Sequence, residues 1–547
     1  MSIVTDKYVD RCIATFKRLK AQRVNFEWLW QRVSDMTIPR RADFVVTRYP
    51  GQRRDYNIYD STAPWALDQF AAGLHSLLTS QALPWFYLRL RDKAKMKNPA
   101  VQAWLQDTAD RINAIFNDPA GGFQSQVHEY YLDIGAFGTA VMYVEDHNGI
   151  KFSTRFLGEC FIRQTHLGSI DTLYRLFGLT LPEAIEMFGE ENLPKEMREI
   201  EDPLRHVQFL HVVEPDGNSW HSCYICTEFD NAIVHEGHYD TFPYMVSRWE
   251  KAAYEDYGRS PAINCLSEIF TVNEMRRTIL RAAQKAVDPP LLIPNDGFMQ
   301  PINLNPNSPN YYDANLPGKI EFLESKGRFD IGETNMHDTQ MAITRAFYVD
   351  AMQLPGGFMP GAKNQNTYMS ATEASIRREN GMRVMGPMVS RMQTEFLGPV
   401  ITRVYDILKK RRSLAPAPAG IKDMSIDIEY VSPLAVAQKA AEGDNFLRMI
   451  QLLNPLVQAN PALLQKLNGD AVVEFAQRIY HVPVELLYTD AQMAQMRQAQ
   501  AQAQQQQQQS NGQQPGGDIQ PNQNVIALKR NMEAANSIGG LMQKMQA

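Results

Sequence analysis

Residues 260–412 show apolar positions at a helical period, interrupted by segments rich in Pro, Gly and Asn. This pattern predicts three long helices with two irregular segments between them. The helices cover 260–288, 331–350 and 370–412, and the irregular segments cover 289–330 and 351–369. Long helices separated by flexible loops seldom form an enzyme pocket. They are typical of a wall that lines a space.

The first of these helices is amphipathic. Its predicted buried side consists of Ile263, Leu266, Phe270, Ile279, Ala283 and Val287. Arg277, Arg281 and Lys285 recur every four residues and form a basic stripe. A helix over 260–288 is roughly 40 Å long. Asp288-Pro289-Pro290 ends it, because the residue before a proline leaves helical space.

The third helix has a marked start and two interruptions. Ser370 and Glu373 form a capping box that can satisfy backbone donors in the first turn. Its apolar face consists of Ile376, Val384, Met388, Met392, Phe396, Val400, Val404 and Leu408. Gly386-Pro387 and Gly398-Pro399 lie inside this pattern, and an internal proline removes a hydrogen bond. We therefore expect one kinked helix rather than two helices.

Residues 1–259 combine helical and strand patterns and predict a mixed α+β domain. Helices are predicted over 1–36, 62–80, 99–117, 123–133 and 181–189. A short strand is predicted over 85–90, and residues 139–240 are rich in strand signals. Within them, turn residues separate three segments that predict an antiparallel meander. These segments are 206–214, 219–229 and 232–238.

The C-terminal region changes character twice. Residues 434–490 predict short helices. Residues 491–547 begin with alternating glutamine and alanine, which cannot bury a core and predict a flexible tail. A last helix is predicted over 526–545.

The composition limits the class of protein. A chain of 547 residues suggests roughly two to four domains. No apolar run approaches the length of a membrane span, and the first residues lack the hydrophobic stretch of a secretory signal. The 5 cysteines have no regular spacing, which indicates a reducing compartment with free thiols. A formal charge of −6 argues against a broad surface that grips nucleic acid, but not against a protein that surrounds it.

The chemical motifs favour a protein without catalytic, cofactor or metal sites. Cys223 and Cys226 lie in a predicted strand, where residues three apart point to opposite faces. The stretch from His235 to His238 resembles a zinc-protease sequence, but that motif needs its second histidine one residue later. The chain contains neither a phosphate-binding P-loop nor a nucleophile elbow, so an ATP-driven motor would have to be another chain.

Two sets of residues are candidates for contact with nucleic acid. In the irregular segment 351–369, Gly356–Gly361 is followed by Lys363, Asn364, Gln365 and Asn366, which could touch phosphates if this loop projects into a channel. The alternative is an ordinary surface loop. The stripe of Arg277, Arg281 and Lys285 could face DNA. Alternatively, the stripe is a solvated or ion-paired helix face. Its ion-pair partners would then lie on the next helix, at Asp330, Glu333 and Asp338.

Several segments together resemble the portal proteins, the head-to-tail connectors of short-tailed bacteriophages. The matching segments occur in the same order as in that family, and together they cover most of residues 8–490. Its first part consists of Asp60-Ser61-Thr62-Ala63-Pro64, Ala71-Ala72-Gly73-Leu74, Trp85-Phe86 and Phe137-Gly138-Thr139-Ala140. Its second part consists of Met369-Ser370-Ala371-Thr372-Glu373-Ala374, Gly386-Pro387, Glu395 and Gly398-Pro399.

The resemblance implies an α+β portal-type fold and a dodecameric ring around an axial channel. The ring would have a mixed α/β wing, long channel-lining helices, a small clip and a helical crown. The wing would be 1–259, the stem helices 260–288 and 331–350, the clip 289–330 and the tunnel loop 351–369. The long kinked helix with the return to the wing would be 370–433, the crown 434–490 and the tail 491–547.

The resemblance also implies a function and partners. The chain would be a non-enzymatic part of the virion at one capsid vertex, made in the host cytoplasm. It would bind the large terminase subunit while double-stranded DNA is packaged, and a tail adaptor protein before ejection. Scaffold and major capsid proteins would surround it, and no membrane would be involved. The alternatives are a DNA-processing enzyme subunit with an unrecognised carboxylate–metal site and a monomeric virion scaffold or adaptor.

Overall fold

The structure is a computed structural model, and the chain divides into two compact units, Met1–Tyr480 and His481–Ala547. The described residues are 6–41, most of 43–287, 291–292, 321–322, 329–352, 385–418, 426–430 and 498. All helices and strands named here belong to the first unit. They form a mixed α+β fold, as the sequence predicts.

An antiparallel sheet with the strand order β4-β5-β6-β7-β8 forms one part of this unit. Its strands are Cys160–Gln164, Ile170–Leu179, Val207–Asp216, Ser219–Cys226 and Ala232–Tyr239. The turns between these strands contain residues in the left-handed backbone conformation, which few residue types adopt. Gly217 has φ 61°, and Asp230 and Asn231 have φ 46° and 50°. The predicted meander of three strands is confirmed as β6, β7 and β8.

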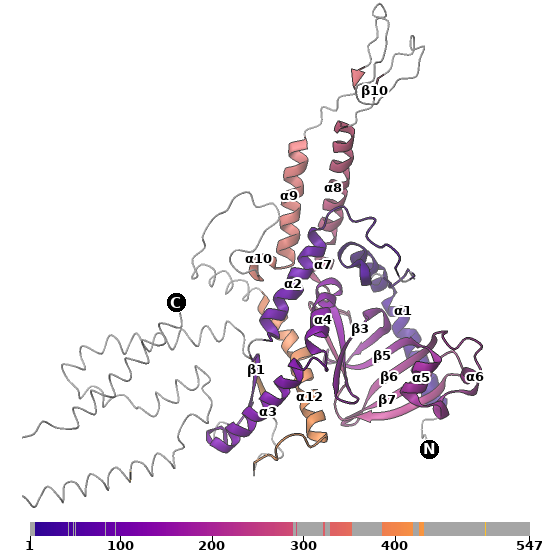
Figure 1. Cartoon of the computed structure of the whole chain (residues 1–547), viewed down its shortest axis with the longest axis vertical. Coiled ribbons are helices and arrows are strands. Elements are labelled where there is room, and N and C mark those ends of the chain that lie inside the picture. The colour runs from indigo at the N-terminus through magenta and orange to yellow at the C-terminus, as the bar shows by residue number, and fades with distance from the viewer. Residues whose placement is uncertain are drawn as a thin grey trace, which may run out of the picture. The chain divides into compact units, whose positions relative to one another are not determined.

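Helices cover both faces of this sheet. The long helix α1, Asp6–Thr37, packs its apolar side on one face. The short helices α5, Leu181–Phe188, and α6, Lys195–Arg198, pack on the other face. Neighbouring residues of β7 show the division, because Cys223 lies in the core under α1 and Tyr224 in the core under α5. Figure 1 shows these layers.

The main core joins helices to a second sheet, of order β3-β2-β9. The helices are α2, Thr62–Leu78; α3, Pro99–Asn117; and α4, Phe123–Phe137. The strands are β2, Thr139–Asp146; β3, Ile150–Arg155; and β9, Tyr244–Arg248. A separate pair joins β1, Phe86–Leu90, to β12, Ile426–Tyr430. Short 3₁₀ turns occur at Pro39–Arg41, Lys95–Lys97, Leu157–Glu159 and Glu190–Asn192.

Two long helices extend together away from the sheets (Figure 1). The predicted helix 260–288 is present in two pieces, α7, Pro261–Asn264, and α8, Leu266–Val287. The predicted helix 331–350 is present as α9, Phe329–Ala346, and α10, Val349–Met352. Beyond α8, β10, Leu291–Leu292, pairs with β11, Glu321–Phe322.

The third predicted helix is confirmed where the structure describes it. Residues 385–410 are helical throughout, and they include a π-helical segment, Gln393–Leu397, followed by α12, Gly398–Lys410. The Gly398 amide donates to the Gln393 carbonyl, five residues earlier. The wider turn allows the helix to continue through Pro399, which has no amide hydrogen. The predicted capping box at Ser370 and Glu373 lies outside the described residues.

One expectation about burial is wrong. The apolar side predicted for residues 260–288 is not buried to its end, because Ala283 is exposed and Val287 is 87% exposed. The described residues leave the last turns of α8 largely uncovered. Trp28 of α1 is another large apolar side chain on the surface, with 57% of its surface exposed.

Candidate functional site

The first half of α8 is anchored in the main core. Leu266, Ile269 and Val272 are buried there. The short helix before it is fixed by Ser260, whose hydroxyl accepts from the Ile263 amide at 2.9 Å and donates to the Ala136 carbonyl at 2.8 Å. This cap satisfies a backbone donor at the start of the helix. The base of α8 is therefore held firmly to α4.

A polar clasp formed by Asn57, Tyr59, Asp60, Asn273 and Gln340 joins both long helices to the start of α2. The Asn273 side-chain oxygen accepts from the amides of Tyr59 at 2.7 Å and Asp60 at 3.2 Å, and its nitrogen donates to the Asn57 carbonyl at 2.9 Å. The Asp60 carboxylate accepts from the Gln340 amide group of α9 at 2.7 Å. The clasp therefore positions α8 and α9 together.

Above the clasp, α8 and α9 pack closely against each other. A Cβ atom at Gly332 of α9 would lie 3.9 Å from the nearest Ile279 carbon of α8. The two helices approach at a position where one of them carries no side chain. The exposed end of α8 follows directly after this contact.

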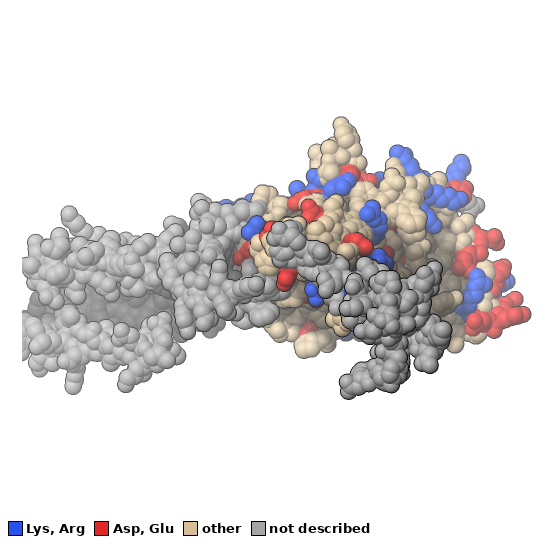
Figure 2. Space-filling model, turned by 90° about the horizontal axis from the view of Figure 1, so that it is seen from above, with Lys and Arg blue, Asp and Glu red and all other residues tan. Residues whose placement is uncertain are grey.

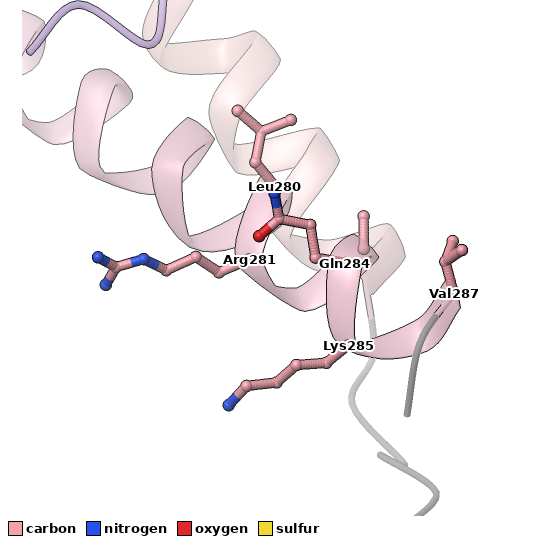
Figure 3. Close-up of a pocket in the computed structure, with 6 residues that line it drawn as sticks. Leu280, Arg281, Gln284, Lys285 and Val287 are labelled. Atoms are coloured by element: carbon pink, nitrogen blue, oxygen red, sulfur yellow. The ribbon is translucent and has the colours of Figure 1, made fainter. Parts of the chain in front are cut away.

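The last two turns of α8 present apolar and basic side chains to the surroundings. Leu280 is 40% exposed, and an open hollow is lined by Leu280, Arg281, Ala283, Gln284, Lys285 and Val287. Figure 3 shows Arg281 and Lys285 extending to the same side of the helix. No ion pair joins either of them to another described residue. This leaves two adjacent cations available to an anionic partner.

Arg277, the third residue of the stripe, behaves differently. Its guanidinium lies 3.3 Å from Glu274 of the same helix and 5.5 Å from the centre of the Tyr59 ring. The Arg277 guanidinium therefore already has partners within the chain. Glu333 and Asp338, proposed above as partners of the stripe, form no ion pair with any of its three members, and the Asp330 side chain lies outside the described residues.

The described part of the chain contains no group of three side chains that could hold a metal ion. Burial raises the pKa of the Cys223 thiol to about 12, which leaves it protonated and unreactive. Cys226 faces the opposite side of β7, as the strand pattern predicts, and the segment from His235 to His238 is part of strand β8. No described helix is long and apolar enough to cross a bilayer.

The described residues do not include the candidate loop, and they contain one contact that the sequence does not indicate. Lys363, Asn364, Gln365 and Asn366 lie outside the described residues, as does most of the loop 351–369. The missed contact is an ion pair of 2.6 Å between Arg248 at the end of β9 and Glu395 in the π-helical segment. No local pattern indicates it, because the two residues are 147 positions apart.

A sequence model of one protein family, described as bacteriophage head to tail connecting protein, matches residues 9–487. The match covers both sheets and nearly all of the described helices. It includes the two long helices α8 and α9, which are called the rod below. The chain belongs to this family.

Two curated relatives agree with this assignment. A probable portal protein of Bordetella phage BPP-1 is 28% identical over 510 residues, which are 89% of this chain and 90% of the relative. A portal protein of Salmonella phage epsilon15 is 26% identical over 513 residues, again 89% of this chain and 90% of the relative. The function is accordingly that of a phage portal, the connector between head and tail.

Proposed function

We propose that copies of this connector assemble into a dodecameric ring, in which α8 and α9 line an axial channel for double-stranded DNA. The observation that supports this most is the rod itself. Its outer half exposes Leu280 and Val287, by 40% and 87%. Apolar side chains gathered at the end of a projecting rod are typical of a contact surface. In a ring, the rods of neighbouring copies cover these side chains.

Arg281 and Lys285 are the DNA-facing residues in this proposal. They project to one side of the rod and form no ion pair with another described residue (Figure 3). Lys and Arg attract phosphates without reading sequence, so they suit a duplex that must slide past. The net charge of −6 limits adhesion elsewhere on the ring.

The remaining assignments extend this proposal along the chain. Residues 289–330 form the clip, 351–369 the tunnel loop and 434–490 the crown. The ring occupies one capsid vertex, where it binds the large terminase subunit during packaging and the tail adaptor afterwards. Scaffold and major capsid proteins contact its outer surface. ATP hydrolysis belongs to the terminase, since this chain has no P-loop.

A matched pair of charge reversals tests the role of the rod. The double variant Arg281→Glu, Lys285→Glu places like charges next to DNA and should reduce the DNase-protected genome per particle by roughly tenfold. The control Arg91→Glu, Lys151→Glu reverses two exposed cations of the body and should package normally. Both proteins should still form rings. If the two variants package the same amount of DNA, α8 does not face the channel.

The tunnel loop has its own test. Deletion of Gly356–Gly361 should impair packaging or retention of DNA, because it shortens the reach of every copy of the loop. Lys363→Ala should act mildly, since single phosphate contacts are weak and screened by salt. Particles filled at normal yield by the deletion variant would show that the loop is only a connector.

A further inference from the structure

The sheet β4–β8 has two outer surfaces that face in opposite directions. One is the outer side of α1, whose inner side packs on Tyr174, Leu210 and Cys223. The other is the outer side of α5 and α6, which pack through Phe188 and Met197 on the reverse face of the same strands. Each helix layer has a buried side and an exposed side. Where residues 9–19 of α1 pack on the sheet, the two exposed sides are therefore on opposite sides of it.

The exposed side of α1 is basic and apolar. Lys17, Ala21, Val24 and Trp28 follow the helical period and form one stripe, all of them exposed, with Lys20 beside it. Val24 is 44% exposed and Trp28 57%. Neither lysine forms an ion pair with a described residue. An exposed tryptophan is unusual for a free surface and typical of a protein interface.

The exposed side of α5 and α6 is acidic and also carries apolar side chains. Ile185 is 36% exposed and Met187 43%. The carboxylates around them are exposed and form no ion pair with a described residue, and they include Glu186, Glu190, Glu191, Glu196, Glu199 and Glu201. Figure 2 shows Asp and Glu gathered at one end of the molecule, the end where Figure 1 places α5 and α6.

We propose that the α1 stripe of one copy binds the α5–α6 face of the next copy around the ring. The proposal rests on the proposed ring and names the surfaces that join its wings. Lysines of the stripe meet the glutamates, while Val24 and Trp28 cover Ile185 and Met187. The α1 stripe and the α5–α6 face are thus complementary both in charge and in apolar surface.

The partner that binds each surface is a second copy of this chain, because every copy carries both the α1 stripe and the α5–α6 face. In a closed ring, each subunit contacts its neighbours through two different faces, one on either side. Surfaces that lie back to back satisfy this geometry. Two surfaces on the same side of the sheet could not.

Charge exchange tests the pairing. The variants Lys17→Glu, Lys20→Glu and, separately, Glu186→Lys, Glu190→Lys should each lower the fraction of chain in rings, measured by native mass spectrometry, by roughly tenfold. A chain that carries all four changes should recover wild-type rings, because the attraction is restored with reversed sign. All four residues are exposed, so circular dichroism and the melting temperature should stay unchanged.

Cross-linking gives a second measurement that does not depend on ring yield. A chain with Ala21→Cys and Met187→Cys should form linked oligomers with a short bismaleimide, while either cysteine alone should not. The five natural cysteines are buried and should not react. Normal rings from both charge-reversed variants, without cross-links, would overturn this interface and leave the ring intact. A wild-type chain that forms no rings would overturn the proposed function as well.

Discussion

The Arg248 guanidinium donates to Glu395 at 2.6 Å and thereby joins the end of β9 to the π-helical segment of the long helix. The same carboxylate accepts from the Arg248 backbone amide at 2.9 Å. Arg248 is 1% exposed, so its charge depends on this partner and on the carbonyl of Gly168 at 2.7 Å. Glu395 belongs to the segments that carry the family resemblance. The pair is a direct link between the sheet and the helix after the proposed tunnel loop.

Breaking this pair should destabilise the fold strongly. Glu395→Gln leaves the Arg248 charge buried without its counter-ion, which costs about 3–5 kcal/mol. The control Asp107→Asn breaks the exposed pair of Asp107 with Arg111, at 2.8 Å, and should cost less than about 1 kcal/mol. Urea unfolding measures both values. If both variants lose the same free energy of unfolding, the Arg248–Glu395 pair does not stabilise the fold more than an exposed ion pair does.

Asp133 should make stability depend on pH. Its burial raises the pKa of the carboxyl to about 6, although Arg41 donates to one of its oxygens and opposes the shift. The other oxygen has no hydrogen-bond partner among the described residues, so Arg41 compensates the burial of the carboxylate only in part. The pKa of an unfolded aspartate is about 3.9, so the folded chain holds the proton more tightly.

The sign of the effect follows from this difference. The contribution of Asp133 is complete below about pH 4 and is lost as the pH rises through about 6. It amounts to about 2–3 kcal/mol. In Asp133→Asn, the fall in the free energy of unfolding between pH 4 and pH 7 should be smaller than in the wild type by that amount. Identical pH profiles for the two proteins would show that folding does not raise the pKa of Asp133.

Asn273 should control how firmly the rod is held. Asn273→Ala removes the acceptor of two backbone amides, and buried donors left unpaired cost about 1–3 kcal/mol. Hydrogen exchange of the Tyr59 and Asp60 amides should become faster. The control Thr271→Ala removes a hydroxyl that bonds only to its own helix, at Ser267, and should leave these amides protected. Unchanged exchange in the Asn273 variant would contradict the clasp.

Gly138 should tolerate no side chain. It ends α4 with φ 76°, and a Cβ atom there would lie 2.4 Å from the Arg259 carbonyl carbon. Gly138→Ala should cost about 3 kcal/mol or more, because both the backbone and the packing are strained. Gly217 also has a positive φ but has nothing within 4 Å, so Gly217→Ala should cost only about 1–2 kcal/mol. Similar melting temperatures would contradict this difference.

Local signals account for most of what the sequence predicts correctly. The turn residues Gly217, Asp230 and Asn231 mark the ends of β6, β7 and β8. Pro99 marks the start of α3, where the Asn98 side chain caps the helix. Each of these signals lies within a few residues of the feature that it predicts. The family resemblance adds the order of the segments and the function.

Contacts between remote segments account for what the sequence does not predict. Strand β1 pairs with β12 so that Phe86 lies opposite Tyr430, and neither segment alone indicates the other. The bond between Asp60 and Gln340 spans 280 positions, and no local pattern indicates it. The exposure of Val287 depends on where neighbouring elements end, since its apolar spacing matches that of buried residues.

Electron microscopy of the purified full-length chain tests the central claim most directly. The account predicts closed rings with a central hole, in which the rods of α8 and α9 stand next to the hole and the sheets lie outside. A chain that remains a monomer over the whole accessible concentration range, or rings whose α8 lies on the outer rim, would contradict it.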